Sequence, residues 1–571
     1  MNYIFKKILL FIFIIPLSVT SQVFMWDGAK SYGSNGSSPT YGICTDIDDN
    51  VYVYGTFRDT LSIGDTSFIC NQEHQWSSDG YIAKFNSNGD FLLALHLITR
   101  GNGKLQQIKC GVDSEMNIIV SGIFTYNIRL QDTTLTSLYS TDSFIAKFNK
   151  YGIRLWVNQI KGTGSDDLYL MDISAENNIV FAVCHDTYGQ FNFNYVSYGD
   201  DTVLYRQDNY LVLALYNSKG ELRWLKSGYG LLEPVTLWLW NLKLKEGHVY
   251  LCGFTCDTLI FDNDTIPVQW GVFEDANMMA KYDERGNKVF LGNFAHYRIN
   301  NFSIDDEDNY FTIGHVFPPL IIGNDTINEV GPADICFAKY DSNLDLQWYH
   351  VILTNQGYAG IATIIYDTED RVYLLGHYKD EMQLGDTSIF AGYYHRTKFF
   401  IARYNSNGDF IHVISSNGKH HHNGTNEFTG TKMIIDNYGD LLVTGNFNEE
   451  AFFGSDTLTS LVGFNQFYAK LLTNPIIVEI NPEIPTVQPD FSYIKISPNP
   501  TLSRVNIELR EFHGNVIIQL FNSSGENLFT KSYNPHINKS IHINLQNYPN
   551  GIYLLKINSN NYSKTKKIIK L

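Results

Sequence analysis

The chain has 571 residues, of which 44% are hydrophobic and only 18% are charged. This composition can bury large cores, so it excludes wholesale disorder. The formal net charge is −17, from 42 Lys and Arg against 59 Asp and Glu. Nucleic acid and anionic membrane surfaces are bound through Lys and Arg, so the charge argues against both as partners.

The N-terminal segment has the pattern of a secretory signal peptide. Lys6 and Lys7 precede the apolar run Ile8 to Ile15, and small residues lead to an expected cleavage between Ser21 and Gln22. The apolar run is too short to cross ~30 Å of hydrocarbon. We therefore expect residues 1–21 to be removed, and the mature chain to have no membrane span.

The middle of the chain is an internal repeat. An Ala-Lys-aromatic tripeptide, exact or degenerate, recurs at residues 83–85, 146–148, 214–216, 280–282, 338–340, 402–404 and 469–471. A strand that ends in glycine marks the same units, at Gly55, Gly122, Gly253, Gly314, Gly376 and Gly445, with Val183 in the third place. The two markers together predict seven units.

Each unit contains four strand-like runs separated by turn residues, as in the first unit, where an Asp/Asn turn follows the first run at residues 46–50. Four main strands repeated radially predict an all-β fold, a seven-bladed β-propeller over residues 22–473. The seventh unit lacks its last strand, and the run Phe24 to Lys30 supplies a candidate that closes the ring. The repeats resemble the secreted bacterial β-propeller repeats labelled SBBP, which implies an extracellular setting but no particular activity.

Proline marks the end of the repeat. Pro475, Pro482, Pro485 and Pro489 make residues 474–490 an expected extended linker. Beyond the linker, residues 491–571 contain short β-type runs at the spacing of a small β-sandwich.

Three separated motifs in this last segment resemble the type A C-terminal sorting domain of the type IX secretion system. They are Ile496 to Pro500, Gly551 to Tyr553, and Lys567 to Leu571 at the end of the sequence. Ser497 stands where the family usually has Tyr. The resemblance implies a sorting signal made of Pro498, Asn499, Pro500, Gly551, Tyr553, Lys567 and Lys570. It also implies secretion machinery as the partner, a Bacteroidetes host, and a location outside the cell or on its outer surface, reached through the periplasm.

Candidate ligand-binding residues are few. Trp238 and Trp240, two residues apart at the start of one strand, point the same way and can stack on a sugar ring or pack between blades. The Asp-rich turns are explained by Asp/Asn turn chemistry rather than by calcium. We expect no metal site and no cofactor, and we expect most of the seven cysteines to be buried thiols.

No catalytic residue is assigned, because the GxSxG, HExxH and GxxxxGK[ST] signatures are missing. The sequence favours a non-catalytic binding or adhesion module with an unknown extracellular glycan or protein ligand. The alternative is a propeller enzyme, a hydrolase or lyase acting on extracellular glycan or peptide, since a converging pair of carboxylates is neither visible nor excluded.

The net charge is unevenly divided. Residues 491–571 carry ten Lys and Arg against three Asp and Glu, which leaves residues 8–490 at −26. The expected propeller is therefore more acidic than the whole chain, which suits solubility outside the cell.

Overall fold

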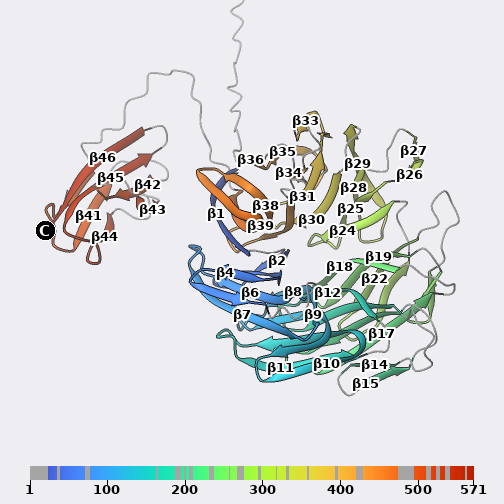
Figure 1. The fold of residues 1–571 in the computed structure, drawn as a ribbon. Helices are drawn as coiled ribbons and strands as arrows, with labels where there is room; N and C mark the ends of the chain where they lie inside the picture. The colour runs from blue at the N-terminus through green and yellow to red at the C-terminus, as the bar shows by residue number, and fades with distance from the viewer. Residues whose placement is uncertain are drawn as a thin grey trace, which may run out of the picture. The chain divides into compact units, whose positions relative to one another are not determined.

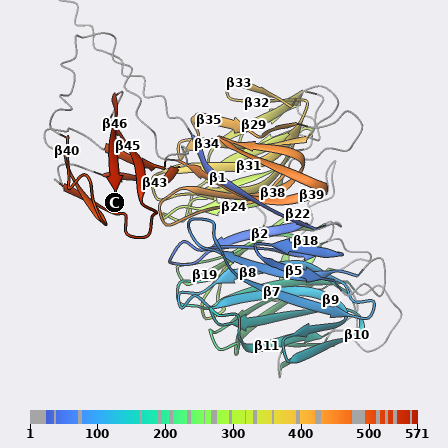
Figure 2. The same ribbon diagram turned by 60° about the vertical axis from the view of Figure 1, so that its left-hand side comes forward.

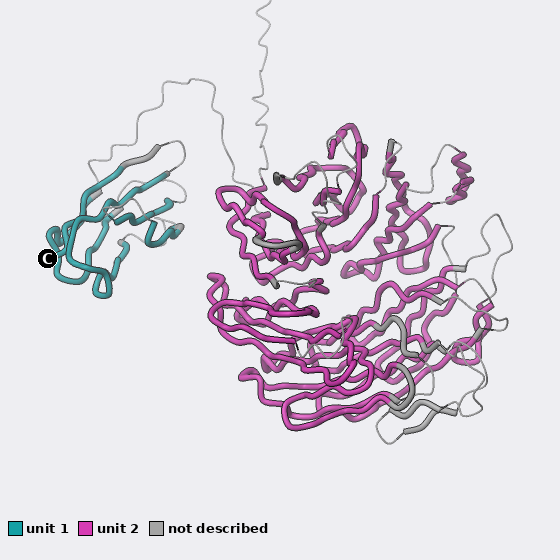
Figure 3. The backbone as a smooth tube through the Cα atoms, in the orientation of Figure 1, with its two compact units in different colours: residues 1–23, 475–571 teal, residues 24–474 magenta. Residues whose placement is uncertain are grey.

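The structure is a computed structural model, and it forms two compact units (Figures 1 and 3). One unit comprises residues 24–474, and the other comprises residues 475–571 together with residues 1–23. The structure describes residues 24–571 except 35–38, 71–76, 162–164, 187–194, 199–200, 205–209, 231–236, 256–257, 267–275, 293–296, 317, 329–333, 356–358, 392–396, 420–428, 474–493, 510–515, 523–526, 534–539 and 560–561. The expected signal peptide, its cleavage point at Ser21 and Gln22, and the expected linker lie outside the described residues.

The larger unit repeats one pattern: four strands paired antiparallel in chain order, which we call a four-strand group. The first three groups are β2 (Thr40–Thr45), β3 (Val51–Phe57), β6 (Asp79–Phe85), β7 (Phe91–Arg100); β8 (Leu105–Val112), β9 (Ile118–Leu130), β10 (Thr133–Phe148), β11 (Arg154–Lys161); and β12 (Ser165–Ile173), β13 (Ile179–Asp186), β16 (Tyr210–Tyr216), β17 (Leu222–Gly230).

The next three groups are β18 (Leu237–Lys245), β19 (His248–Thr255), β22 (Ala276–Asp283), β23 (Lys288–Gly292); β24 (Arg298–Ile304), β25 (Tyr310–His315), β28 (Ile335–Tyr340), β29 (Leu346–Asn355); and β30 (Ala359–Tyr366), β31 (Arg371–Lys379), β34 (Thr397–Asn405), β35 (Phe410–Ser415).

The last group joins both ends of this unit. It contains β37 (Thr429–Ile435), β38 (Leu441–Phe453), β39 (Asp456–Leu472) and, from the other end of the sequence, β1 (Met25–Ser34). Ala29 of β1 lies opposite Ala469 of β39. In Figure 2 the blue strand β1 runs beside the orange strand β39.

Extra hairpins between the second and third strands link neighbouring groups. They are formed by β4 (Thr60–Ile63) and β5 (Thr66–Ile69), β14 (Tyr195–Tyr198) and β15 (Asp201–Leu204), β20 (Leu259–Phe261) and β21 (Asp264–Ile266), β26 (Leu320–Ile322) and β27 (Asp325–Ile327), and β32 (Glu381–Leu384) and β33 (Thr387–Phe390). Strands β4, β14, β20 and β32 each pair with the last strand of the preceding group, and β36 (Asn417–Lys419) pairs with β38. These pairings protect strand edges that would otherwise be exposed.

Apolar residues fill the space within and between the groups. In the third and fourth groups, Leu213, Leu215 and Leu251 are fully buried in one core cluster. The first strands lie toward the middle of the unit, where β2, β8, β12, β18 and β24 are labelled in Figure 1. The six cysteines that the structure describes are free thiols, and five of them are buried.

The smaller unit has two antiparallel sheets that share one apolar core. One sheet is β40 (Ile494–Ser497), β41 (Arg504–Leu509) and β44 (Ser540–Asn544), and the other is β43 (Asn527–Tyr533), β42 (Val516–Phe521), β45 (Gly551–Ser559) and β46 (Tyr562–Lys570). Ile507 from the first sheet and Ile518 and Leu555 from the second are fully buried in this core.

Candidate functional site

The lysine of the repeated tripeptide forms an ion pair with the aspartate that begins the turn between the first and second strands. The pairs are Lys84 Nζ with Asp46 Oδ2 at 3.0 Å, Lys147 with Asp113 at 2.7 Å, Lys339 with Asp305 at 3.3 Å and Lys470 with Asp436 at 2.7 Å. We call these the turn pairs.

The same aspartates also hold their own turns. Asp46 Oδ1 accepts hydrogen bonds from the backbone N–H of Asp48 at 3.1 Å and of Asn50 at 3.0 Å. Burial opposes ionisation of Asp46, but hydrogen bonds from Asn50, Lys84 and Tyr52 outweigh it and lower the pKa of the carboxyl group. The Asp/Asn turn chemistry expected from the sequence is therefore directly visible in these bonds.

The third group replaces both partners of the turn pair. Leu215 stands in place of the lysine and is fully buried, and Ser174 stands in place of the aspartate. Ser174 Oγ accepts hydrogen bonds from the backbone N–H of Glu176 and of Asn178, both at 3.2 Å. A buried carboxylate without its lysine would be costly, so the two replacements compensate each other.

Every first strand contains a register shift near the same level, opposite the recurring glycine of the second strand in six groups and opposite Val183 in the third. The extra residue there brings the first strand close to the second. A Cβ on Gly253 would meet the carbonyl oxygen of Trp238, and a Cβ on Gly314 would meet that of Arg298. This close backbone approach explains the recurring glycine.

The shift places equivalent residues of the first strands at equal heights. Lys109, Asn241, Asn301 and Lys432 each follow the shift and pair with the residue before the glycine position. Asp172 and Lys243 occupy equivalent positions on β12 and β18, two residues beyond the level of Lys109 and Asn241. They lie opposite Val180 and Tyr250 of the second strands.

A cavity of about 690 Å³ is lined by residues of β12, β18, β24, β30, β37 and the turns that follow them. Asp172, Lys243 and Lys432 face it together with Asn241 and Asn301. Asn241 Nδ2 donates to Asn301 Oδ1 at 2.5 Å and to Phe302 O at 3.0 Å, and Asn301 Nδ2 donates to Ala362 O at 3.1 Å. These amides tie neighbouring first strands together around the cavity.

The lysines at this cavity differ from those of the turn pairs. Among the described residues, no hydrogen bond or ion pair reaches the Nζ of Lys109, Lys243 or Lys432. Burial, followed by repulsion from Lys243 and Lys109, lowers the pKa of Lys432 to about 7, while Asp172 acts in the opposite direction. Burial also lowers the pKa of Lys109. We call Lys109, Lys243 and Lys432 the cavity lysines: Lys243 and Lys432 line the cavity, and Lys109, on β8, repels Lys432.

The described carboxylates that line the cavity all have partners. Asp172 Oδ2 accepts from Leu244 N at 2.8 Å, Asp306 pairs with Lys245 at 3.1 Å, Asp367 and Glu369 pair with Arg371 at 2.5 and 2.8 Å, and Asp436 pairs with Lys470 at 2.7 Å. These contacts give the carboxylates a structural role in the strands and turns around the cavity.

The two tryptophans singled out from the sequence lie on β18 with their rings stacked. The ring centroids of Trp238 and Trp240 are 6.2 Å apart with an interplanar angle of 17°, and the ring of Phe254 lies near-parallel to both. Trp238 is 40% exposed and Trp240 is 37% exposed, so part of each ring is open to solvent. Their role in binding stays a prediction.

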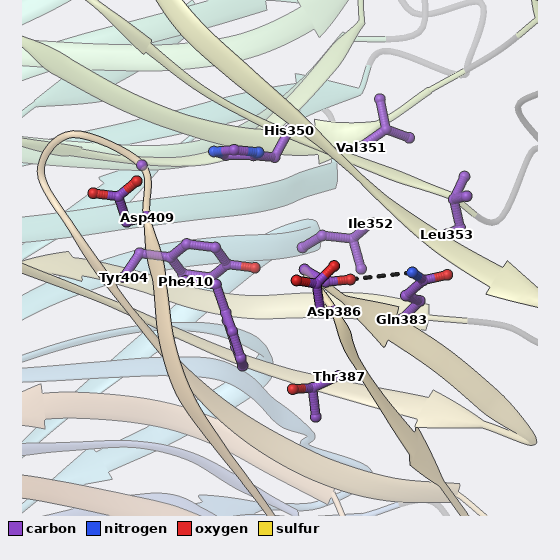
Figure 4. Close-up of a pocket in the computed structure, with 12 residues that line it drawn as sticks. His350, Val351, Ile352, Leu353, Gln383, Asp386, Thr387, Tyr404, Asp409 and Phe410 are labelled. Carbon is purple, nitrogen blue, oxygen red and sulfur yellow. Dashed lines mark hydrogen bonds between the residues drawn. The ribbon is translucent and has the colours of Figure 1, made fainter. Parts of the chain in front are cut away.

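A second hollow of about 460 Å³ lies beside β29, the turn joining β32 to β33, and the turn joining β34 to β35 (Figure 4). His350, Asp386 and Asp409 line it. Asp409 Oδ2 accepts a hydrogen bond from Asn405 Nδ2 at 2.8 Å, and the His350 ring packs 5.4 Å from that of Trp348. The dashed line in Figure 4 is the hydrogen bond from Gln383 Nε2 to Gly385 O at 3.1 Å.

The motifs of the sorting signal come together in the smaller unit. Asn499, in the segment Pro498 to Pro500, donates through Nδ2 to Lys567 O at 2.7 Å and accepts through Oδ1 from Ile569 N at 2.9 Å. Gly551 lies opposite Lys570 in the β45–β46 pair. The three motifs thus form one structural element around β46.

Two residues of this element are buried. Tyr553, 4% exposed, donates through its hydroxyl to Pro549 O at 2.5 Å. Lys570, 8% exposed, donates through Nζ to Gln546 O at 3.3 Å and to Tyr548 O. The exposed members of the motif are the ones that a binding partner can reach, and they are Pro498, Asn499, Pro500, Gly551 and Lys567.

Comparison with known families identifies this element. The profile of the secretion system C-terminal sorting domain matches residues 495–571. The domain marks proteins that the type IX secretion system delivers to the cell surface or the extracellular space, and this chain contains the domain. None of the curated protein sequences matches the chain.

Solved structures with low sequence identity are similar in fold to parts of the chain. The structure of the Dos1 propeller is 9% identical, with 78% of this chain and 95% of that chain covered and a TM-score of 0.37. A protein of unknown function from Dyadobacter fermentans DSM 18053 is 10% identical, with 79% and 99% covered and a TM-score of 0.37. A fungal alcohol oxidase of the AA5 family in complex with copper is 12% identical, with 96% and 100% covered and a TM-score of 0.36.

The larger unit is propeller-like in the arrangement of its four-strand groups. No helix in the described part of the chain is long and apolar enough to cross a membrane.

The cavity lysines were not singled out from the sequence. Lys109 and Lys432 do occupy equivalent places before the glycine-ended strands, so aligning the repeats by their first strands would have drawn attention to them.

Proposed function

We propose that the protein is an exported binding or adhesion module without catalytic activity, whose larger unit, residues 22–473, is a seven-bladed β-propeller. The seven four-strand groups support this architecture, and the pairing of β1 with β39 supports closure by the N-terminal strand. Closure removes two open strand edges, which favours a rigid ring over an open array.

The observation that carries the non-catalytic assignment is the state of the carboxylates at the cavity. Glycoside hydrolysis requires one carboxylic acid with a raised pKa and a second carboxylate placed to act with it. Each described acid at the cavity is instead held by a cation or by a backbone N–H. A hydrolase or lyase acting on extracellular glycan or peptide would need groups other than these.

A binding screen tests the assignment. The mature full-length chain is applied to arrays of extracellular glycans and proteins, and each captured ligand is incubated with the protein and analysed by chromatography. We expect capture without change of the ligand. Cleavage of a captured glycan or peptide at a rate above that of the buffer would overturn the assignment in favour of the enzyme.

The ends of the chain define the route of export in this proposal. Residues 1–21 act as a signal peptide, and residues 491–571 form a small β-sandwich that the type IX machinery recognises before the chain is released or attached at the surface of a Bacteroidetes cell. Two sheets around one core support the sandwich.

Deletion of residues 491–571 is expected to leave the protein in the periplasm, as measured by fractionation and immunoblotting. A smaller change, Asn499→Ala, removes both hydrogen bonds to β46 and is expected to reduce secretion. Asn527→Ala is the matched control, since Asn527 is an exposed residue of the same unit outside the motifs. Normal secretion of the truncated chain would contradict the proposed route.

A further inference from the structure

Positive charge at the cavity contrasts with the rest of the larger unit. Residues 8–490 have a formal net charge of −26, so a lysine in this region has many carboxylates available as partners. The turn pairs use such partners at four turns. The cavity lysines have none within contact distance among the described residues.

The placement of the cavity lysines is energetically unfavourable in the free protein. Lys109 and Lys432 lie on the strands that flank β2, at the level of Gly42, beside which the hydroxyl group of Tyr54 lies. Lys243 also repels Lys432. Like charges held close together in an enclosed site destabilise the fold unless an opposite charge joins them.

Asp172 does not supply that opposite charge at contact distance. Its Oδ2 accepts a hydrogen bond from the backbone N–H of Leu244 at 2.8 Å, and within the described part of the chain it forms no ion pair with a cavity lysine. Three ammonium groups against one carboxylate leave the middle of the unit positive. The asparagines at the cavity are likewise engaged with neighbouring strands, so the lysines are the available donors.

We propose that the cavity binds a ligand through an oxyanion group, a carboxylate or a sulfate, held by Lys243 and Lys432, with Lys109 adding to the positive potential at Lys432. This inference rests on the proposed binding function and names the chemistry that the ligand must carry. A volume of about 690 Å³ lies within the range of ordinary small-ligand sites. Charge-assisted hydrogen bonds from ammonium groups are among the strongest polar contacts that a protein offers to such a group.

Isothermal titration calorimetry with the mature full-length chain at pH 6 tests the inference. The probes are D-glucuronate, inorganic sulfate, and D-glucose as the neutral counterpart of glucuronate. We expect glucuronate or sulfate to bind and glucose not to bind. Tighter binding of glucuronate than of sulfate identifies an acidic sugar as the source of the group, and the reverse order identifies the free inorganic anion.

The double variant Lys243→Met and Lys432→Met is expected to weaken anion binding by about tenfold or more, because the charge-assisted contacts of both lining lysines are lost. Lys219→Met is the matched control: it removes the same charge from an exposed turn and is expected to leave affinity unchanged. The thermal midpoint of each variant verifies its fold. If the double variant does not fold, Lys243→Met provides the same test with one substitution.

Equal binding of glucose and glucuronate, absence of any anion binding at millimolar concentration, or full affinity in the lysine variants would overturn the inference. Failure of the inference is separable from failure of the proposed function. A ligand captured in the array screen that binds the lysine variants with unchanged affinity would leave the binding module intact and reject the anion site. Cleavage of a captured acidic glycan by the protein, lost in the lysine variants, would retain the anion site and reject the non-catalytic assignment.

Discussion

The turn pairs and the cavity lysines are two sets of lysines in the same repeated scaffold, and their surroundings are opposite. Lys147 is 6% exposed along its side chain and lies 2.7 Å from Asp113, which is 1% exposed. Lys432 lies in the same unit but faces other lysines, and its pKa is lowered to about 7. The comparison teaches that a lysine which recurs with its carboxylate, as in four of the groups, serves the fold, whereas lysines without such a partner keep their charge free for a ligand.

The largest expected effect comes from breaking a turn pair. Lys147→Leu leaves the buried Asp113 without its cation, so we expect it to lower the free energy of unfolding by about 3–5 kcal/mol. Chemical denaturation monitored by tryptophan fluorescence measures the loss.

The third group supplies the matched control, because it contains Leu215 with Ser174 in these two places. The double variant Lys147→Leu with Asp113→Ser is expected to recover most of the lost stability. Equal stability of the single and double variants would show that the turn pair does not explain the repeated lysine.

The second expected effect is a pH dependence of anion binding. The pKa of Lys432 in the folded protein is about 7, set by burial and then by Lys243 and Lys109 against the opposing Asp172. If the ligand requires the protonated amine, affinity is expected to fall by about tenfold between pH 6 and pH 8, as the group loses its proton. Sulfate and glucuronate keep their charge over this range, so calorimetry reports on the protein alone.

The variant Lys432→Met is the control for this pH profile, because it has no amine to titrate. It should bind more weakly at pH 6 and show a flatter profile. An equally steep profile in this variant would assign the pH dependence to another group.

The remaining charged groups of the cavity, apart from the cavity lysines and Asp172, are paired ions: Lys245 with Asp306, Arg371 with Asp367 and Glu369, and Lys470 with Asp436.

A third effect concerns stability. Replacing Lys432 by Met removes repulsion and no contact partner, so we expect the free energy of unfolding to rise by on the order of 1 kcal/mol. A base whose pKa is lowered in the folded state carries its full penalty below that pKa, and the penalty declines as pH rises from about 7 toward the unfolded value. The gain should therefore be largest at pH 6 and shrink toward pH 10. A loss of stability at pH 6 would place Lys432 among the structural lysines.

The smallest expected effect comes from the tryptophan pair. Trp240 is 37% exposed, so Trp240→Ala is expected to cost about 1 kcal/mol of stability, well below the 3–5 kcal/mol typical of a buried tryptophan. Reduced affinity for a captured glycan in this variant, at unchanged fold, would support a stacking role. A stability loss in the buried range with unchanged affinity would assign the ring to packing.

Much of the architecture was predictable because it rests on local chemistry. The Asp46 turn is closed by backbone groups two and four residues away, and the turn at Asn86 ends in Gly89 with φ of 80°. Such turns can be recognised in the sequence of the repeats from their Asp, Asn and Gly residues. The sorting motifs were recognised from their residues, and the structure adds that Asn499 holds β46 through both atoms of its amide group.

By itself the sequence determined the period of the repeat, the positions of its turns, and the C-terminal address, because each depends on residues that are close in the chain or on a motif with fixed letters. Only the tertiary structure decided where charge gathers. Lys243 and Lys432 are far apart in the sequence and line one cavity because their strands carry the same register shift, and Lys109 on β8 acts on Lys432. An acidic sequence can therefore enclose a basic site, since net charge is a sum over residues and electrostatic potential depends on where they lie.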